Sequence, residues 1–321
     1  MWKIGNIEIK SKVVLAPMAG VTSLAYRKFM SEFGTGLTVS EMVSDCGLIY
    51  ENKKTLDYIK TFDGERPVAI QLFGNDSLKI CKAIDIVLAN NSHIDMIDIN
   101  LGCPVPKVTS TGAGSALLKD SEKLYKFMKE IVDYSPVPVT AKIRLGWNEN
   151  SINFRENIRM LEKAGVAAIG IHSRTTSQGY TGKARHELLK GLRDEMNVPL
   201  VVSGDIYSLD DVINVLNLTK ADAVMVARGG VGNPTLVKQI NAYYEKGIKV
   251  PNASLIENLS YLEKFTDLLI EEKGEYRAIS ILRGIAPKFL DGYPRMKQYK
   301  NMIAQSITNR ESLMRIIQNL K

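Results

Sequence analysis

Short apolar runs alternate with segments of helical period along most of the chain. Eight runs are rich in β-branched residues: Val13–Ala16, Leu37–Val39, Val68–Phe73, Met96–Asn100, Val139–Arg144, Ala168–His172, Leu200–Ser203 and Ala223–Ala227. Between them, segments such as Ser121–Val132 and Asn157–Ala164 place apolar residues three and four positions apart, as on one face of a helix. Eight strand–helix units in succession predict an α/β fold, a parallel (β/α)8 TIM barrel.

An open, doubly wound sheet is the competing architecture. Sheets of that kind usually have fewer strands and carry a GxGxxG motif after the first strand. Here the first run leads into the sequence APMAG at residues 16–20, which lacks that glycine pattern. The barrel is therefore the favoured prediction.

The alternation stops near Tyr244, and residues 247–252 read as a linker. Ser254 and Glu257 then have the spacing of a capping box that opens a helix. The apolar residues of one face of this helix are Leu255, Leu259, Leu262, Phe265 and Leu269. We therefore expect two domains, a barrel over residues 1–245 and a small all-helical domain over residues 246–321.

Composition limits the cellular setting and the chemistry. With 321 residues, 45% hydrophobic and 24% charged, the chain is typical of a globular protein. No apolar stretch of about 18 residues occurs, and the start lacks the apolar core of a signal peptide, so we expect a cytoplasmic protein with no membrane partner. Cys46, Cys81 and Cys103 have no CxxC spacing, and with three His residues they suggest neither a metal site nor disulfides. Cys46 and Cys81 have no role that the pattern indicates.

The charge is concentrated toward the C-terminus. The formal net charge is +7, and the segment from Lys246 onward holds 13 Lys and Arg against 8 Asp and Glu. An excess of positive charge favours an anionic partner. We therefore expect the surface that faces this partner to lie in the helical region.

Polar residues follow the strands of the predicted barrel at the ends where active sites of this fold form. They are Gln71, Asn100, Cys103, Lys142, Arg144, His172 and Arg174, and Met18 and Ala19 follow the first strand at the same end of the barrel. Singly, each has a structural alternative: Gln71 or His172 could satisfy backbone groups, Lys142 could pair with an acid, and lone Cys residues are usually buried hydrophobes. As a set at one mouth, they indicate an active site.

The last two strands lead into glycine-containing loops. These are Ser203-Gly204-Asp205 and Ala227-Arg228-Gly229-Gly230, the second followed by Asn233-Pro234 as an N-cap and first-turn proline. Exposed backbone N–H groups, a helix N-terminus and the Arg228 guanidinium would bind a phosphate monoester there. With Lys142 beside an isoalloxazine ring, this pattern suggests flavin mononucleotide (FMN) as the cofactor.

Seven motifs resemble those of one family, in its order and spacing. They are APMAGVT, LTVSEM, DINLGCP with GAGSALL, VTAKIRLGW, IHSRT, SGDI and VARGGVGNP. Over nearly its whole length the chain resembles the bacterial tRNA-dihydrouridine synthases, in particular their B subgroup. The resemblance implies FMN-dependent reduction of specific uridines in tRNA to 5,6-dihydrouridine, with NADPH as the electron donor.

Residue roles also follow from the resemblance. It places around the flavin Pro17, Met18, Ala19, Gln71, Lys142 and His172, and at its phosphate end Ser203, Gly204, Asp205, Ala227 and Arg228. Cys103 is implied as the general acid, and Asn100 and Arg174 as residues near the target uracil. The chain departs from the family, which more often has Asn at Ser203 and Gly at Ala227 and Ser173. These are small substitutions.

The reaction suits a thiol acid. Hydride from flavin N5 to uracil C6 leaves negative charge toward C5 and O4, and a proton must reach C5. A thiol with a pKa of about 8.5 is mostly protonated at pH 7 and still transfers its proton readily. We therefore expect Cys103 to supply that proton.

The helical region carries cations and aromatic rings that could contact RNA. The cations are Arg277, Arg283, Lys288, Arg295, Lys297 and Lys300, interleaved with Tyr276, Phe289, Tyr293 and Tyr299. Such a surface could track phosphates while rings support unstacked bases, although a solvated helix face with core aromatics has the same pattern. We expect tRNA as the partner, a target uridine flipped out of its stack, and a monomeric protein.

Two other functions remain open at this point. A flavin-dependent reductase or dehydrogenase of a free pyrimidine would share the barrel and the flavin, although the basic helical region speaks against it. An RNA-binding module with a vestigial barrel would not need Cys103 and Lys142. The sequence does not indicate which uridine is reduced.

Overall fold

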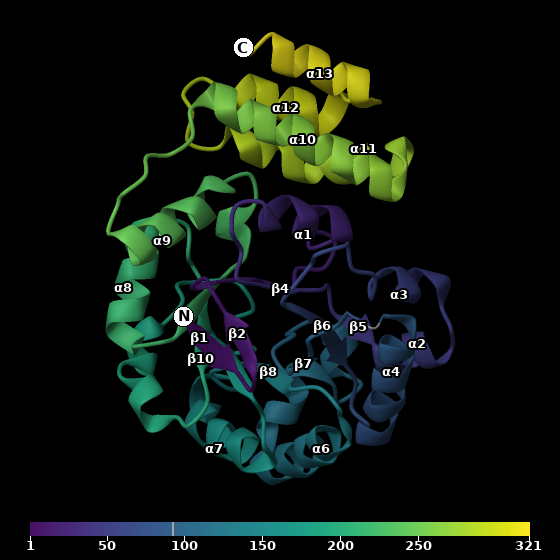
Figure 1. The fold of residues 1–321 in the computed structure, drawn as a ribbon, viewed down its shortest axis with the longest axis vertical. Helices are drawn as coiled ribbons and strands as arrows, with labels where there is room; N and C mark the ends of the chain where they lie inside the picture. Colours follow the sequence, from purple (N-terminus) through teal and green to yellow (C-terminus); the bar gives the residue numbers. More distant parts are fainter. Residues whose placement is uncertain (92) are drawn as a thin grey trace.

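Eight parallel strands close into a ring in the larger part of the molecule (Figure 1). The computed structural model describes residues 1–91 and 93–321. The strands of the ring are β3 (Val13–Leu15), β4 (Leu37–Val39), β6 (Val68–Phe73), β7 (Met96–Asn100), β8 (Val139–Arg144), β9 (Ala168–His172), β10 (Leu200–Ser203) and β11 (Ala223–Val226). β11 pairs with β3 and β4 pairs with β6, which closes the sheet. The predicted barrel is confirmed, and the open sheet does not form.

Helices surround this ring (Figure 1). They are α1 (Leu24–Ser31), α2 (Asp45–Ile49), α3 (Lys53–Asp57), α4 (Ser77–Asn90), α5 (Pro106–Thr109), α6 (Ser121–Tyr134), α7 (Phe154–Ala164), α8 (Leu209–Thr219) and α9 (Thr235–Lys246). Their amphipathic pattern explains their placement: in α6, Leu124, Phe127, Met128 and Ile131 are buried, as their spacing predicts. A short strand, β5 (Val43–Ser44), pairs with the last residues of β6.

One crossover has no α-helix. Between β9 and β10 the chain forms the 3-10 turns η3 (His186–Leu189) and η4 (Leu192–Glu195), although the sequence predicts a helix after each strand. The first part of this crossover is held at the carboxyl ends of the strands, where the Thr176 N–H donates a hydrogen bond to the Gly146 carbonyl in the loop after β8. It is therefore not free to form a helix on the outside of the barrel. The short remainder covers the barrel with the buried side chains of Leu189 and Leu192.

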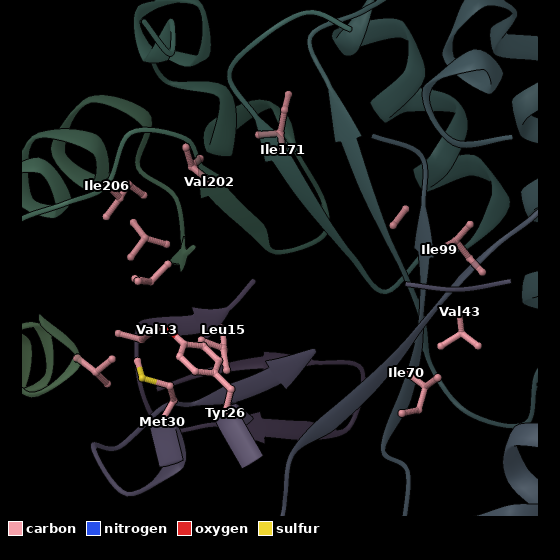
Figure 2. Close-up of a cluster of buried hydrophobic side chains, with 14 of the residues drawn as sticks. Val13, Leu15, Tyr26, Met30, Val43, Ile70, Ile99, Ile171, Val202 and Ile206 are labelled. Carbon is pink, nitrogen blue, oxygen red and sulfur yellow. The ribbon is translucent and has the colours of Figure 1, made fainter. Parts of the chain in front are cut away.

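The hydrophobic core has an inner and an outer layer. An N-terminal hairpin, β1 (Trp2–Ile4) and β2 (Ile7–Ile9), lies across the ring in Figure 1, and its Trp2, Ile4 and Ile9 pack with inward-facing residues of the barrel strands. This hairpin was not predicted from the sequence. The outer layer joins strands to helices, and Figure 2 shows Val13 and Leu15 of β3 gathered with Tyr26 and Met30 of α1. A closed interior leaves only the carboxyl ends of the strands for a site.

The C-terminal region is helical, as predicted. It contains α10 (Leu255–Lys273), α11 (Glu275–Ile285), the 3-10 turn η6 (Ala286–Leu290), α12 (Lys297–Ser306) and α13 (Arg310–Gln318). The capping box of Ser254 and Glu257 is confirmed. Figure 1 shows these helices stacked beyond α1, and rings of α1 meet rings of α10, with Phe29 5.4 Å and Tyr26 5.8 Å from Phe265 between centroids. The division into domains at residue 246 stays a prediction. No helix in the described ranges is long and apolar enough to span a bilayer.

Candidate active site

The carboxyl ends of the barrel strands surround a pocket of about 430 Å³. Most of the predicted site residues line it, namely Pro17, Met18, Ala19, Gln71, Asn100, Cys103, Lys142, His172, Ser203, Gly204, Asp205, Ala227 and Arg228. They come from seven of the eight strands or the loops that follow them. The pocket volume falls in the range of small-molecule and cofactor sites.

Cys103 is held in a defined position at the wall of this pocket. Its side chain is only 8% exposed, and it follows β7 between Gly102 and Pro104. Asn100 Oδ1 accepts hydrogen bonds from the backbone N–H of Gly102 at 3.1 Å and of Cys103 at 2.9 Å, while Ser115 Oγ donates to the Cys103 carbonyl at 2.8 Å. Burial raises the pKa of the Cys103 thiol, outweighing the Val105 N–H and the nearby cations. The group is therefore a thiol, with a proton to give, at neutral pH.

A chain of buried polar side chains lies beneath Cys103. Asn100 Nδ2 donates to Gln71 Oε1 at 2.7 Å, and Gln71 Nε2 donates to Asp98 Oδ2 at 2.6 Å. Thr140 Oγ1 donates to Asp98 Oδ1 at 2.6 Å. These bonds fix the amide orientations of Asn100 and Gln71. Asp98 was not among the residues predicted from the sequence, although a carboxylate within the apolar run MIDIN was a signal.

Lys142 and His172 both line the pocket, and between them they carry one positive charge. Burial, together with the neighbouring Arg144, lowers the pKa of Lys142 to about 8. Burial first, and then Lys142 and Arg144, also lower the pKa of His172, which is therefore neutral. One ammonium beside a neutral imidazole suits an electron-rich ring that gains negative charge.

The loops after β10 and β11 have the backbone form of an anion site. Gly204 has φ of +117° and Asp205 φ of +45°, and among the described residues their backbone N–H groups have no hydrogen-bond partner in the protein. At Gly229 an added Cβ would lie 1.9 Å from the Ile206 carbonyl oxygen, so the two loops meet too closely for any other residue. With Arg228 on the pocket wall, this donor set fits a phosphate group.

The helix behind these loops differs from the prediction. The Asn233 N-cap with a first-turn proline is wrong: α9 begins at Thr235 and its N-cap position is Pro234, without a side-chain cap. Instead, the 3-10 turn η5 (Arg228–Gly230) directly follows β11 and bends the chain back at the pocket. The loop N–H groups and Arg228 therefore carry the anion site, and no residue of α9 lines the pocket.

Arg174 is placed otherwise than the sequence suggests. It does not line the pocket, and its side chain is 2% exposed. Its Nη2 donates to both carboxylate oxygens of Asp205, at 2.8 and 2.7 Å, and also to the Gly182 carbonyl. Burial raises the pKa of Asp205, but the Ala184 N–H and Arg174 outweigh burial and hold it below its usual range. The structure thus shows Arg174 supporting the loop after β10, with its Nη1 3.3 Å from Nε2 of the pocket residue His172, and its contact with a substrate stays a prediction.

Two exposed tyrosines at the mouth were not predicted. Tyr180 and Tyr207 line the pocket, and both rings lie near the Arg228 guanidinium, at 5.5 and 5.9 Å from their centroids. Tyr180 stands between Gly179 and Gly182, both with positive φ. An aromatic residue in a glycine-rich rim loop was the available signal.

A second, larger groove of about 900 Å³ joins this pocket. It runs from the rim to the helical region and shares with the pocket Met18, Val21, Tyr207, Arg228 and Gly229. Its far wall includes Lys288, Asp291 and Tyr293. The pocket therefore opens toward the C-terminal helices.

Comparison with known sequences covers almost the entire chain. The model of the dihydrouridine synthase (Dus) family matches residues 14–321. The tRNA-dihydrouridine synthase B of Vibrio vulnificus is 33% identical over 93% of this chain and 92% of its own length. The enzyme of the same name from Pasteurella multocida is 33% identical, over 90% of this chain and 87% of its own.

Solved structures resemble the fold. Histamine dehydrogenase from Rhizobium sp. 4-9 superposes with a TM-score of 0.59 at 14% identity, covering 83% of this chain and 50% of that one. An old yellow enzyme homologue from Zymomonas mobilis gives 0.55 at 12%, covering 78% of this chain and 93% of that one. At such identities the likeness concerns the barrel architecture alone.

Proposed function

The chain belongs to the dihydrouridine synthase family, and on that premise we propose that it reduces specific uridines of tRNA to 5,6-dihydrouridine with FMN and NADPH. The observation that carries the proposal is the placement of Cys103 and Lys142 on one pocket with the anion site formed by the loops after β10 and β11. The site thus combines a proton donor, a cation and a phosphate cradle.

Two groups of residues would hold FMN. Ser203, Gly204, Asp205, Ala227 and Arg228 would bind the phosphate end, and Pro17, Met18, Ala19, Gln71, Lys142 and His172 would surround the ring. Arg174 neutralises Asp205, which keeps that carboxylate from repelling a phosphate. When bound, the flavin supplies the hydride for uracil C6.

Side chains of the protein would carry out the other parts of the reaction, namely proton transfer, charge stabilisation and positioning. Cys103 Sγ would give its proton to uracil C5, for which its raised pKa keeps it protonated. The Lys142 ammonium would stabilise negative charge that develops in the pocket. Asn100, whose Oδ1 accepts from two backbone N–H groups, would hold the Cys103 loop. Its Nδ2 donates to Gln71 Oε1 at 2.7 Å and to Met42 Sδ at 3.7 Å, so contact with the uracil would replace the weaker bond to sulfur. Direct contact of Arg174 with the uracil stays a prediction that its ion pair with Asp205 does not favour.

The groove toward the helical region is where we place the RNA. Lys249, Lys288 and Arg228 line it, and an exposed base could reach the pocket along it. Two of the residues predicted to contact RNA have structural partners instead. Phe289 is completely buried in the core, and Arg283 donates to the Ile307 carbonyl at 2.7 Å. Tyr276, at 90% exposed, stays available for a base.

The substrate can be tested by reoxidation of the reduced protein. FMN-loaded protein is reduced anaerobically with NADPH and mixed with unmodified tRNA or with free uracil, and flavin absorbance is followed. Reoxidation by tRNA and none by uracil supports the proposal. Reoxidation by uracil alone would establish the alternative, a free-pyrimidine reductase.

A further inference from the structure

The turn Ser203–Asp205 has a strained backbone that needs support from outside. Gly204 and Asp205 are successive residues with positive φ, a conformation that is costly for a non-glycine residue such as Asp205. The support comes from the segment that follows β9. Ala184 N–H donates to Asp205 Oδ2 at 2.8 Å, and Ser173 N–H donates to the Ser203 carbonyl at 3.2 Å.

His186 completes this support from behind. Its Nε2 lies 2.9 Å from the Gly204 carbonyl oxygen, and its Nδ1 lies 2.9 Å from Ser173 Oγ. A carbonyl oxygen only accepts, so Nε2 carries the hydrogen and donates it. Nδ1 of a neutral imidazole is then an acceptor, and the Ser173 hydroxyl donates to it. The Gly204 carbonyl thus fixes the tautomer, and the Ser173 hydroxyl satisfies the remaining ring nitrogen.

The surroundings keep His186 neutral. Burial lowers its pKa and outweighs the Gly204 carbonyl, Asp205 and Glu187, which raise it, while Arg174 lowers it further. Neither His186 nor Ser173 lines the pocket. Any effect of the pair on a ligand must therefore pass through the turn.

We propose that His186 is a positioning residue for the phosphate of the cofactor, holding the Gly204 carbonyl so that the N–H groups of Gly204 and Asp205 remain available to the phosphate, with the Ser173 hydroxyl donating to its Nδ1. The inference rests on the proposed flavin function. Ser173 is one of the positions where the chain departs from the family it resembles, and in this proposal its hydroxyl acts on the phosphate site through His186.

The test compares FMN with riboflavin, which has the same ring system but no phosphate. Dissociation constants are measured by flavin fluorescence for the wild-type protein, His186→Phe, His186→Gln, Ser173→Ala and, as control, His93→Phe in an exposed turn before β7. We expect His186→Phe to weaken FMN binding about tenfold, the effect of one lost hydrogen bond, and to leave riboflavin affinity unchanged. His186→Gln, which keeps an N–H donor, restores most of the FMN affinity, and Ser173→Ala gives a smaller loss. The ³¹P resonance of bound FMN shifts in His186→Phe and not in His93→Phe.

Two results would overturn the inference: unchanged FMN affinity in both His186→Phe and Ser173→Ala, or an equal loss for FMN and riboflavin, which would mean general damage to the fold. If His186→Phe does not fold, Ser173→Ala and His186→Gln carry the same comparison. A wild-type protein that binds neither flavin would contradict the proposed function itself.

Discussion

The Oδ1 atom of Asn100 accepts a hydrogen bond from the backbone N–H of Cys103 at 2.9 Å. Its Nδ2 at the same time donates to Gln71, which is bonded to Asp98. The position of the thiol is therefore set by a buried polar network and not by the loop alone. A substitution that breaks the network should displace the acid without removing it.

Asn100→Ala tests that dependence. We expect a fall in the tRNA-dependent turnover number of about tenfold or more, because a small displacement of a catalytic group is costly. Flavin reduction by NADPH should be retained. Asn90→Ala, on the exposed end of α4, is the matched control. A normal turnover number in Asn100→Ala would show that the Cys103 loop keeps its place without this bond.

Cys103→Ala removes the proposed acid itself. Loss of general acid catalysis should lower the rate of dihydrouridine formation by about a hundredfold or more. The protein should still bind FMN and oxidise NADPH. Cys46→Ala, a partly exposed thiol outside the pocket, should act like the wild type. Wild-type dihydrouridine formation by Cys103→Ala would remove the thiol from the mechanism.

The protonation of Lys142 can be measured directly in the flavin-free protein. With a pKa lowered to about 8, Lys142 is charged at pH 7 and loses its proton as the pH rises through about 8. Acylation by acetic anhydride, followed by peptide mass spectrometry, should show its amine becoming reactive with that midpoint. The ordinary lysine value of about 10.4 is the midpoint expected of an amine that the pocket does not perturb. A Lys142 midpoint at that ordinary value would contradict the electrostatic account of the pocket.

An ion pair buried in the barrel wall supplies a prediction for stability. Arg27 Nε lies 2.7 Å from Glu65 Oε1, and both side chains are almost completely buried. Arg27→Met leaves Glu65 without its partner, which should lower the free energy of unfolding by about 3 to 5 kcal/mol. Denaturant unfolding measures the change. Arg315→Met, which breaks an exposed pair with Glu311, should have little effect, and an equally small effect at Arg27 would refute the assignment.

The proposed RNA groove can be probed through its cations. Lys249→Ala with Lys288→Ala should weaken tRNA binding and reduce the slope of log affinity against log salt by about 0.9 for each phosphate that the protein no longer neutralises. Binding is measured by fluorescence titration at several salt concentrations. Lys53→Ala on α3 is the control. Substitution is preferable to removing the helical region, because α10 covers rings of α1. An unchanged slope would place the RNA elsewhere.

The repeating elements of the fold could be predicted from the sequence, because the barrel strands are buried apolar runs and the longer helices, such as α6 and α7, are amphipathic. The hydrophobic pattern does not predict an element whose structure depends on contacts with distant parts of the chain. The β1–β2 hairpin is too short to stand out, yet Trp2, Ile4 and Ile9 cover the barrel interior. The crossover after β9 forms 3-10 turns because its first half is bound at the rim.

In the active site, too, some residues could be placed from the sequence and others could not. Residues that directly follow strands, such as Gln71 and Lys142, could be placed because strand ends meet at one rim. Arg174 follows a strand too, but its partner Asp205 lies 31 positions away, and their ion pair holds the guanidinium against the loop after β10, outside the pocket lining. Similarly, Phe289 has the spacing of an RNA-facing ring and is buried against Phe265 instead. Sequence spacing does not reveal such long-range partners.

The most direct test of the account is the product itself. FMN-loaded protein is incubated with NADPH and unmodified tRNA, and the RNA is digested and analysed by nucleoside mass spectrometry with mapping of the modified position. The account predicts 5,6-dihydrouridine at defined uridines and none in reactions with Cys103→Ala. The absence of dihydrouridine from tRNA, while the protein holds FMN and oxidises NADPH, would contradict it.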